Sequence, residues 1–234
     1  MTDKPAAPDD TSDDHPYWLQ MWRDNTIGGF HQEATNEQLI SCWHRQNLPP
    51  GSRILVPLCG KSLDMLWLQQ QGFDVVGVEL SPVAAKAFFQ GLPLKPRKTR
   101  QGAFTRWSSP GLTIWCGDFF AIRTQQLGRF DAVFDRAALT ALPAELRARY
   151  VAHLQTLMHA GTVIFLMTTE DATNTSRGQA PTSDDEVLAL YRDLFHVQLL
   201  DTVYEDRGGH GLTDLKVYRM TARRDQTEES QPDR

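Results

Sequence analysis

The stretch RILVPLCGKSLDMLWLQQQGFDVVGVELS, residues 53–81, decides the fold. It starts with an apolar run at residues 54–58, continues through a loop and an amphipathic segment, and closes with a second apolar run that ends at Glu79. Short apolar runs of this kind favour buried strands, and the amphipathic segment between them favours a helix. The stretch therefore predicts a strand–loop–helix–strand unit, the layout with which nucleotide-binding α/β folds begin.

The loop of this unit lacks the glycines of phosphate-binding motifs. Residues 60–62 read Gly-Lys-Ser, like the end of a P-loop, but the first glycine of that motif is replaced by Leu55, inside the predicted strand. Two of the three glycines of the dinucleotide fingerprint are also missing, so the backbone would not approach a pyrophosphate closely. Glu79 lies about 20 residues after Leu58, where an acidic residue hydrogen-bonds a ribose diol. The pattern predicts a ligand with a ribose and no pyrophosphate, which S-adenosylmethionine (SAM) fits.

Composition limits the class of protein. The chain has 234 residues, 41% of them hydrophobic, and a formal net charge of −5, which predicts one substantial core and does not suggest a nucleic-acid partner. Its three cysteines, Cys42, Cys59 and Cys116, lack CxxC spacing, which indicates a reducing compartment and argues against a zinc site. No apolar run approaches the length of a membrane span, and residues 1–16 lack the apolar core of a signal peptide. We expect a cytoplasmic monomer that binds neither membranes nor metal.

Polar ends flank a region in which strands and helices alternate. Residues 1–14 are predicted as a disordered acidic head, residues 15–221 as a single domain and residues 222–234 as a flexible polar tail. Residues 92–102, which include the basic run KPRKTR, are interpreted as a solvated loop. The predicted strands lie at residues 53–58, 74–79, 103–107, 112–116, 130–135, 161–169, 196–204 and 212–221. Strands alternating with helices predict a doubly wound α/β sheet, mostly parallel, with an antiparallel terminal pair.

Polar groups at the carboxyl ends of the strands are the candidate ligand contacts, because open α/β sheets bind ligands there. Asp118 and Phe119 follow the run at residues 112–116, and together they suit an adenine, with the carboxylate facing the exocyclic amine and the ring packing on the base. The alternative for Asp118 is a turn residue after Gly117. Arg136 suits the carboxylate of a methionine moiety. Its alternative is a surface pair or a structural clamp beside Asp135.

The N-terminal region offers weaker signals. Trp18 and Trp22 lie on one face of the first predicted helix, a spacing typical of core residues that also fits a lid over a cationic sulfonium. His31 follows the Gly28-Gly29 pair, which we interpret as a hinge, and is a candidate base; the alternative is an incidental histidine.

At this level of detail the sequence resembles the bacterial form of the thiopurine S-methyltransferase family, a group of SAM-dependent class I methyltransferases. The resemblance covers residues 17–218 and is carried by five motifs. They are W-x3-W-R (residues 18–23), F-H-Q (30–32), V-P-L-C-G-K-S-L-D-M-L-W (56–67), G-x-x-V-V-G-V-E-L-S (72–81) and F-D-x-x-x-D-R-x-A-L-x-A-L (130–142).

The resemblance implies a seven-stranded Rossmann-like sheet with an N-terminal helical cover. It implies cofactor contacts at Trp18, Leu58, Glu79, Asp118 and Arg136, of which Asp118 stands at a position that varies within the family. It also implies that Phe30, next to His31, lines the pocket of an aromatic acceptor. Arg207, in a loop that departs from the family pattern, would lie near the acceptor, where it and Arg136 would stabilise a thiolate.

The implied function is transfer of a methyl group from SAM, leaving S-adenosylhomocysteine (SAH), to the sulfur of a small aromatic or heterocyclic thiol. Inorganic selenium or tellurium species are possible further acceptors. Two alternatives remain open from the residues alone: a methyltransferase for halide or thiocyanate, and a SAM-sensing protein without turnover.

Overall fold

The computed structural model describes residues 15–27, 31–93, 95–170, 182–206 and 212–223. The predicted head, most of the predicted tail, the two hinge glycines, Phe30 and Arg207 lie outside these ranges. The strands are β1 (Arg53–Val56), β2 (Asp74–Glu79), β3 (Arg97–Gln101), β4 (Phe104–Ser109), β5 (Leu112–Cys116), β6 (Ala132–Arg136), β7 (Val163–Glu170), β8 (Phe195–Asp206) and β9 (Leu212–Ala222). The helices are α1 (His15–Arg23), α2 (Glu37–Cys42), α3 (Asp64–Gln70), α4 (Pro82–Gln90), α5 (Thr124–Leu127), α6 (Ala138–Ala141), α7 (Ala144–Leu157) and α8 (Asp184–Tyr191), with short 3-10 turns η2 (Trp43–Gln46) and η3 (Phe119–Ala121).

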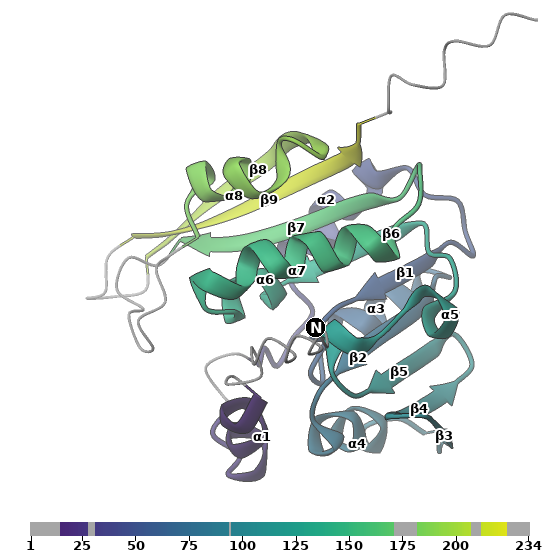
Figure 1. Ribbon diagram of the computed structural model, residues 1–234. Coiled ribbons are helices and arrows are strands. Elements are labelled where there is room, and N and C mark those ends of the chain that lie inside the picture. The colour runs from purple at the N-terminus through teal and green to yellow at the C-terminus, as the bar shows by residue number, and fades with distance from the viewer. Residues whose placement is uncertain (1–14, 28–30, 94, 171–181, 207–211, 224–234) are drawn as a thin grey trace, which may run out of the picture.

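The described strands form one sheet in the order β3-β4-β5-β2-β1-β6-β7-β9-β8 (Figure 1). The five central strands, β5-β2-β1-β6-β7, are parallel, and the strands added at the two ends are antiparallel. The chain runs from β1 outward to β2 and β5, then returns to β6 on the other side of β1. The strand order therefore reverses between β1 and β6, and such a reversal marks the ligand-binding edge of an open α/β sheet.

Alternate side chains of the central strands enter two apolar layers. In β1, Leu55 belongs to the cluster that α7 covers through Leu154. Ile54 and Val56 belong to the cluster on the opposite face, which α2, α3 and α4 cover. This alternation follows from the two-residue period of a strand and gives each face of the sheet a helical layer.

Helix α1 lies apart from both layers. Trp22 and Ile27 form a small third cluster with Ala84 of α4, and Trp18 and Met21 pack against it. In Figure 1, α1 lies on the side of the sheet toward which the arrowheads of β1, β5 and β7 point. It is therefore the predicted N-terminal cover, placed at the carboxyl ends of the parallel strands.

The doubly wound α/β class and the terminal antiparallel pair β8–β9 are confirmed, and the predicted strands at residues 103–107 and 112–116 pair as the hairpin β4–β5. The expected count of seven strands is wrong, because the described sheet has nine. Residues 97–101, interpreted as loop, form β3, an exposed edge strand that pairs with β4. Its charged sequence carries no apolar alternation, and the strand is held by backbone pairing and by Lys98, whose Nζ lies 3.7 Å from the centre of the Trp107 ring.

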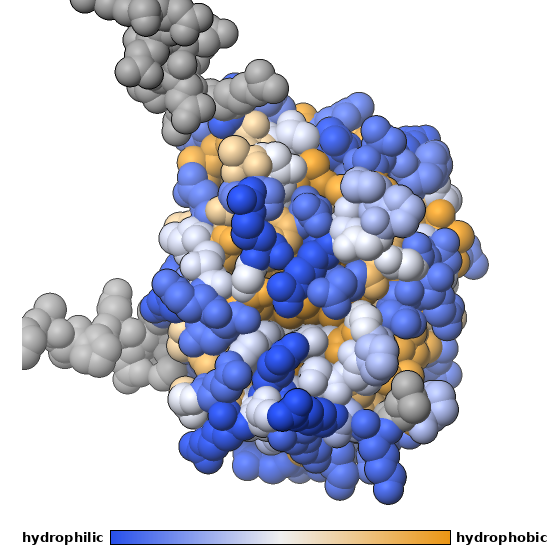
Figure 2. All heavy atoms as spheres, turned by 90° about the vertical axis from the view of Figure 1, so that its right-hand side faces the viewer, coloured by the Kyte–Doolittle hydropathy of each residue, from blue (hydrophilic) through white to orange (hydrophobic). Residues whose placement is uncertain are grey.

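The face of the molecule on the right-hand side of Figure 1, away from α1, presents mainly hydrophilic side chains with apolar ones between them (Figure 2). No helix within the described ranges is long and apolar enough to cross a membrane.

Candidate active site

A pocket of about 120 Å³ opens at the carboxyl ends of β1, β2, β5 and β6, beneath α1. Its wall combines strand ends, the loops that follow them and one face of α1. The lining residues are His15, Trp18, Trp22, Ile27, His31, Val56, Leu58, Cys59, Gly60, Lys61, Ser62, Val78, Glu79, Leu80, Asp118, Phe119, Phe120, Phe134, Arg136, Ala137, Ala141, Leu142 and Leu146. The structure thus brings together seven predicted site residues: Trp18, His31, Leu58, Glu79, Asp118, Phe119 and Arg136.

Glu79, the last residue of β2, is held by two backbone N–H groups. Gly60 N donates to Oε2 at 2.8 Å, and Ser81 N donates to Oε1 at 2.7 Å. Burial raises the pKa of this carboxyl to about 7, against the opposing effect of these hydrogen bonds. Each carboxylate oxygen has a second lone pair, so both remain able to accept from a ligand hydroxyl. The side chain is therefore fixed in direction and ready to bind donors.

The turn at residues 58–60 packs closely against β2. Leu58 has a φ of 46° and Gly60 a φ of 55°, so both lie in the left-handed region, which is costly for a leucine. Cys59 N donates to the carbonyl of Val78 at 3.0 Å. A Cβ placed on Gly77 would lie 2.5 Å from Cys59 Sγ, so this approach requires a glycine in β2. The turn stands between β1 and α3, the position at which dinucleotide-binding folds have their glycine-rich phosphate loop.

Asp118 caps the turn that follows β5, so its alternative role as a turn residue is observed. Its Oδ1 accepts from Phe120 N at 2.8 Å and lies 3.5 Å from Nε2 of His15, the first residue of α1. Burial acts to raise the pKa of Asp118, but the hydrogen bonds from His15 and from Phe120 N–H outweigh it and hold the pKa below its ordinary value. Asp118 thus connects the edge of the sheet with the cover.

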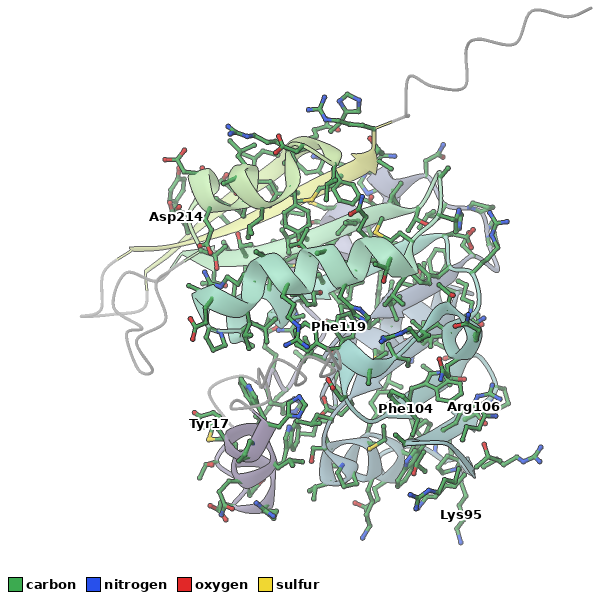
Figure 3. All side chains as sticks on the ribbon, viewed as in Figure 1. Tyr17, Lys95, Phe104, Arg106, Phe119 and Asp214 are labelled. Atoms are coloured by element: carbon green, nitrogen blue, oxygen red, sulfur yellow. The ribbon has the colours of Figure 1, made fainter. Side chains whose placement is uncertain are left out.

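Phe119 is buried against α7 and also lines the pocket. Its ring centre lies 5.3 Å from that of Tyr150 and 5.2 Å from that of His153, both on α7. Figure 3 shows Phe119 next to α7, on the side of that helix nearer to α1. The neighbouring Phe120 also lines the pocket and is less buried, so sequence reasoning missed one of the two rings at this wall.

Arg136, the last residue of β6, forms its ion pair with Asp64 and not with the neighbouring Asp135. Its Nε donates to Asp64 Oδ2 at 2.6 Å, and Nη2 lies 3.4 Å from Ser62 Oγ. Asp135 instead accepts from Tyr150 Oη at 2.7 Å and from the first N–H groups of α6. Burial raises the pKa of Asp135 to about 6.

The N-terminal candidates also reach the pocket. Trp22 is buried against α4, whereas Trp18 is half-buried at the pocket wall. The pKa of His31 is lowered by burial and by the positive charges of Lys61 and Arg136. These effects favour the neutral form of His31. Phe30 and Arg207 are outside the described residues and are not placed.

Several residues in or directly behind the pocket wall had no clear signal in the sequence. Asp64 reads as an ordinary acidic residue at the start of a helix, and Lys61 and Ser62 read as parts of a false P-loop motif. Ala137 has a φ of 72°, which sequence alone does not reveal. Among the described residues, no group of three or more His, Cys, Asp or Glu side chains is arranged to hold a metal ion.

Comparison with solved structures gives the class. The chain matches the crystal structure of a 1,6-didemethyltoxoflavin-N1-methyltransferase from Burkholderia thailandensis, with bound 1,6-didemethyltoxoflavin and SAH, at a TM-score of 0.63 and 15% identity, covering 95% of this chain and 94% of that one. It matches magnesium protoporphyrin IX methyltransferase from Synechocystis PCC 6803, with bound SAH, at 0.62 and 14% identity, covering 90% and 100%. The fold is that of SAM-dependent methyltransferases.

Sequence comparison gives the family within that class. Residues 13–222 match the family model for thiopurine S-methyltransferase. A thiopurine S-methyltransferase of Stutzerimonas stutzeri (strain A1501) is 45% identical over 220 residues, 92% of this chain and 93% of the relative. One from Pseudomonas fluorescens (strain SBW25) is 40% identical over 215 residues, 88% and 98% of the two chains. The chain belongs to the thiopurine S-methyltransferase family of SAM-dependent enzymes.

Proposed function

We propose that this enzyme transfers the methyl group of SAM to the sulfur of a small aromatic or heterocyclic thiol, with inorganic selenium or tellurium species as further acceptors. The observation that supports it most is the meeting, in one pocket, of a fixed acidic side chain at the end of β2 with the guanidinium of Arg136, held by Asp64, at the end of β6. The first suits the ribose of SAM, and the second suits an anionic group.

The proposed cofactor half of the pocket uses residues on β1, β2 and β5. Glu79 accepts from the ribose hydroxyls, and the turn at Leu58 supplies a wall close to the strand ends. Asp118 and Phe119 bind the adenine, with Asp118 also holding the start of the cover through His15. Trp18 packs over the cofactor from α1. These groups fit SAM because the pocket has an acid for a ribose and a closed turn where a pyrophosphate would need glycines.

The proposed acceptor half lies toward β6 and the segment that carries His31. Lys61 and Arg136 give this wall a positive charge, which favours the thiolate over the thiol. Arg136 pairs with either the thiolate or the methionine carboxylate, since both are anionic. Phe30 and Arg207, which lie outside the described residues, are proposed for the same half from the family resemblance alone. His31, whose neutral form is favoured, accepts a proton from acceptors that enter as thiols.

When bound, SAM supplies an electrophilic methyl group on a sulfonium sulfur. The protein supplies the alignment of the acceptor, worth several orders of magnitude in effective concentration, and a largely apolar enclosure that excludes water. Aromatic thiols ionise near neutral pH, so the positive wall at Lys61 and Arg136 is enough to hold a thiolate and a strong general base is not required.

The test is binding followed by turnover. SAH should raise the thermal midpoint of the purified protein by mass action, whereas NADH should not. Radiolabelled SAM should then methylate members of a panel of aromatic thiols, selenite and tellurite, with halides and thiocyanate as comparison. Stabilisation by SAH without transfer to any acceptor would favour a SAM sensor, and transfer to halide alone would reassign the acceptor.

A matched pair of variants tests the cofactor assignment. Glu79→Ala should weaken SAH binding by about ten- to a hundredfold, the value of losing charge-assisted hydrogen bonds of roughly 1.5–3 kcal/mol. Asp131→Ala removes another carboxylate that accepts from a backbone N–H, that of Arg53, but lies outside the pocket lining. Equal SAH affinity in the two variants would place the ribose elsewhere.

A further inference from the structure

Asp64 is a buried carboxylate that lies behind the pocket wall and bonds two of its lining residues, Arg136 and Ser62. Its side chain is 1% exposed. Oδ2 accepts from Arg136 Nε at 2.6 Å and from Ser62 Oγ at 3.1 Å, and Oδ1 accepts from the backbone N–H of Asn36 at 2.9 Å. Two segments distant in sequence, at Asn36 and Arg136, therefore converge on one side chain.

These partners belong to the pocket and its cover. Arg136 and Ser62 line the pocket. Asn36 ends the segment that begins at His31, another lining residue, and its side chain caps α2 by accepting from Gln38 N and Leu39 N. The carboxylate thus joins the charged wall at the end of β6 to the segment that leads into the N-terminal cover.

The position of Asp64 on α3 does not explain these contacts. It is the first residue of α3, where an exposed acid favourably opposes the helix dipole without being buried. Its carboxylate accepts hydrogen bonds from Asn36, Ser62 and Arg136, and from no N–H of α3. Burying an ion pair is a poor source of stability, because desolvation offsets the attraction. The arrangement is better suited to fixing direction than to stabilising the fold.

A guanidinium is planar, so fixing one N–H fixes the directions of the others. The bond from Nε to Asp64 sets the plane of Arg136, and the longer approach of Nη2 to Ser62, at 3.4 Å, leaves the outer nitrogens at the pocket wall, with the side chain 14% exposed. Arg136 would otherwise be a flexible cation at the end of a strand.

We propose that Asp64 is a positioning residue for methyl transfer: it holds the guanidinium of Arg136 in the orientation that binds an anionic group in the pocket and ties that orientation to the placement of the segment from His31 to Asn36. The inference rests on the proposed function for the anion that Arg136 meets. It adds a residue that acts through Arg136 and does not itself touch cofactor or acceptor.

The experiment is a double-mutant cycle with Asp64→Asn, Arg136→Gln and the double variant, each normalised to the folded fraction measured by its cooperative urea melt. Asp64→Asn should lower kcat/KM by about tenfold or more. It should have almost no further effect in the Arg136→Gln background, because both changes break the same Asp64–Arg136 interaction. The control Asp184→Asn, which breaks the ion pair with Lys216 outside the pocket lining, should leave kcat/KM within about twofold. Additive effects, or an unchanged kcat/KM in Asp64→Asn, would overturn the proposal.

A second measurement does not depend on turnover or on the folding of Asp64→Asn. In the wild type, the Nε–H proton of Arg136, assigned by its loss in Arg136→Gln, should exchange slowly with solvent because it is buried against Asp64. Fast exchange, like that of an exposed arginine, would refute the positioning role. Failure of the wild type to methylate any acceptor would refute the proposed function and leave the exchange result to decide the geometry.

Discussion

Gly77 in the middle of β2 offers a direct test of how the pocket turn is built. A Cβ added there would lie 2.5 Å from Cys59 Sγ, 2.9 Å from Met65 Cε and 3.3 Å from Cys59 Cβ. Met65 and Cys59 are both buried, so their side chains have little room to move away from an added methyl group. The change Gly77→Ala therefore forces the turn at Cys59 away from β2.

The magnitude follows from two opposing effects. A single extra methyl in a packed core costs about 1–3 kcal/mol through strain. Against this, Gly→Ala at an ordinary backbone conformation stabilises by about 0.4–1 kcal/mol, because the unfolded chain has less entropy to lose. The net expectation is a loss of about 1–2 kcal/mol in the free energy of unfolding, or roughly 2–8 °C in thermal midpoint for a chain of this size.

The same displacement should reach the ligand. Gly60, next to Cys59, donates the hydrogen bond that fixes Glu79 Oε2. Loss of that geometry should weaken SAH binding by about tenfold, the equivalent of one charge-assisted hydrogen bond. Urea melts and SAH calorimetry on the same samples measure the two effects together.

Two further variants separate this cause from a general effect of alanine. Gly91→Ala, at the end of α4, would bring its Cβ no closer than 3.7 Å to any non-neighbouring atom, and should leave stability unchanged or raise it by up to about 1 kcal/mol. Cys59→Ala removes the nearest clashing atom, so the double variant Gly77→Ala/Cys59→Ala should be more stable than the sum of the single changes predicts. A Gly77→Ala protein as stable as Gly91→Ala, or strict additivity in the double variant, would refute the reasoning.

Three other predictions follow from buried groups near the pocket. Because the pKa of Glu79 is raised to about 7 in the folded state from an ordinary value of 4.5, the folded state binds the extra proton between these limits. The free energy of unfolding should therefore fall as pH rises through that window, by on the order of 3 kcal/mol relative to Glu79→Gln, as pH-dependent urea melts would show. Tyr150→Phe removes the donor to Asp135 Oδ2 and should cost about 1–3 kcal/mol in urea melts. Trp18→Ala should weaken SAH binding in calorimetry while costing less than about 1.5 kcal/mol in stability, whereas Trp22→Ala, which truncates a buried ring, should cost about 3 kcal/mol or more.

Each of these has a result that would contradict it. A pH-independent difference between wild type and Glu79→Gln would mean that the carboxylate is charged throughout. Tyr204→Phe, which changes an exposed tyrosine, is the control for Tyr150→Phe, and equal stability of the two variants would remove the buried hydrogen bond from the argument. A large loss of stability in Trp18→Ala with unchanged SAH affinity would make Trp18 a core residue.

The sequence predicted the parts of the site that depend on strand ends. Glu79 ends a predicted strand, and Asp118 and Arg136 each follow one, so strand periodicity alone was enough to bring them to one edge of a parallel sheet. The same reasoning missed Asp64, because its burial depends on segments at Asn36 and Arg136 that are distant in sequence. Pairing between such segments has no local signal.

The edge strand and the turn geometry were missed for related reasons. β3 contains charged residues that neither alternate nor bury, so only its pairing with β4 makes it a strand. The predicted strand at residues 53–58 ends at Val56, because Leu58 adopts a left-handed conformation that its residue type disfavours. Tertiary packing decides both cases against the local preference.

The small cluster under α1 sets the cost of opening the pocket. Trp22, Ile27 and Ala84 are separate from the two large clusters that hold the sheet and its helices. A segment held by so few buried contacts undergoes sub-global opening at a free energy well below that of complete unfolding. We therefore predict that the exchange of SAH for fresh SAM requires the detachment of this nine-residue helix, and that substitutions in the cluster change the rate of exchange without changing the core.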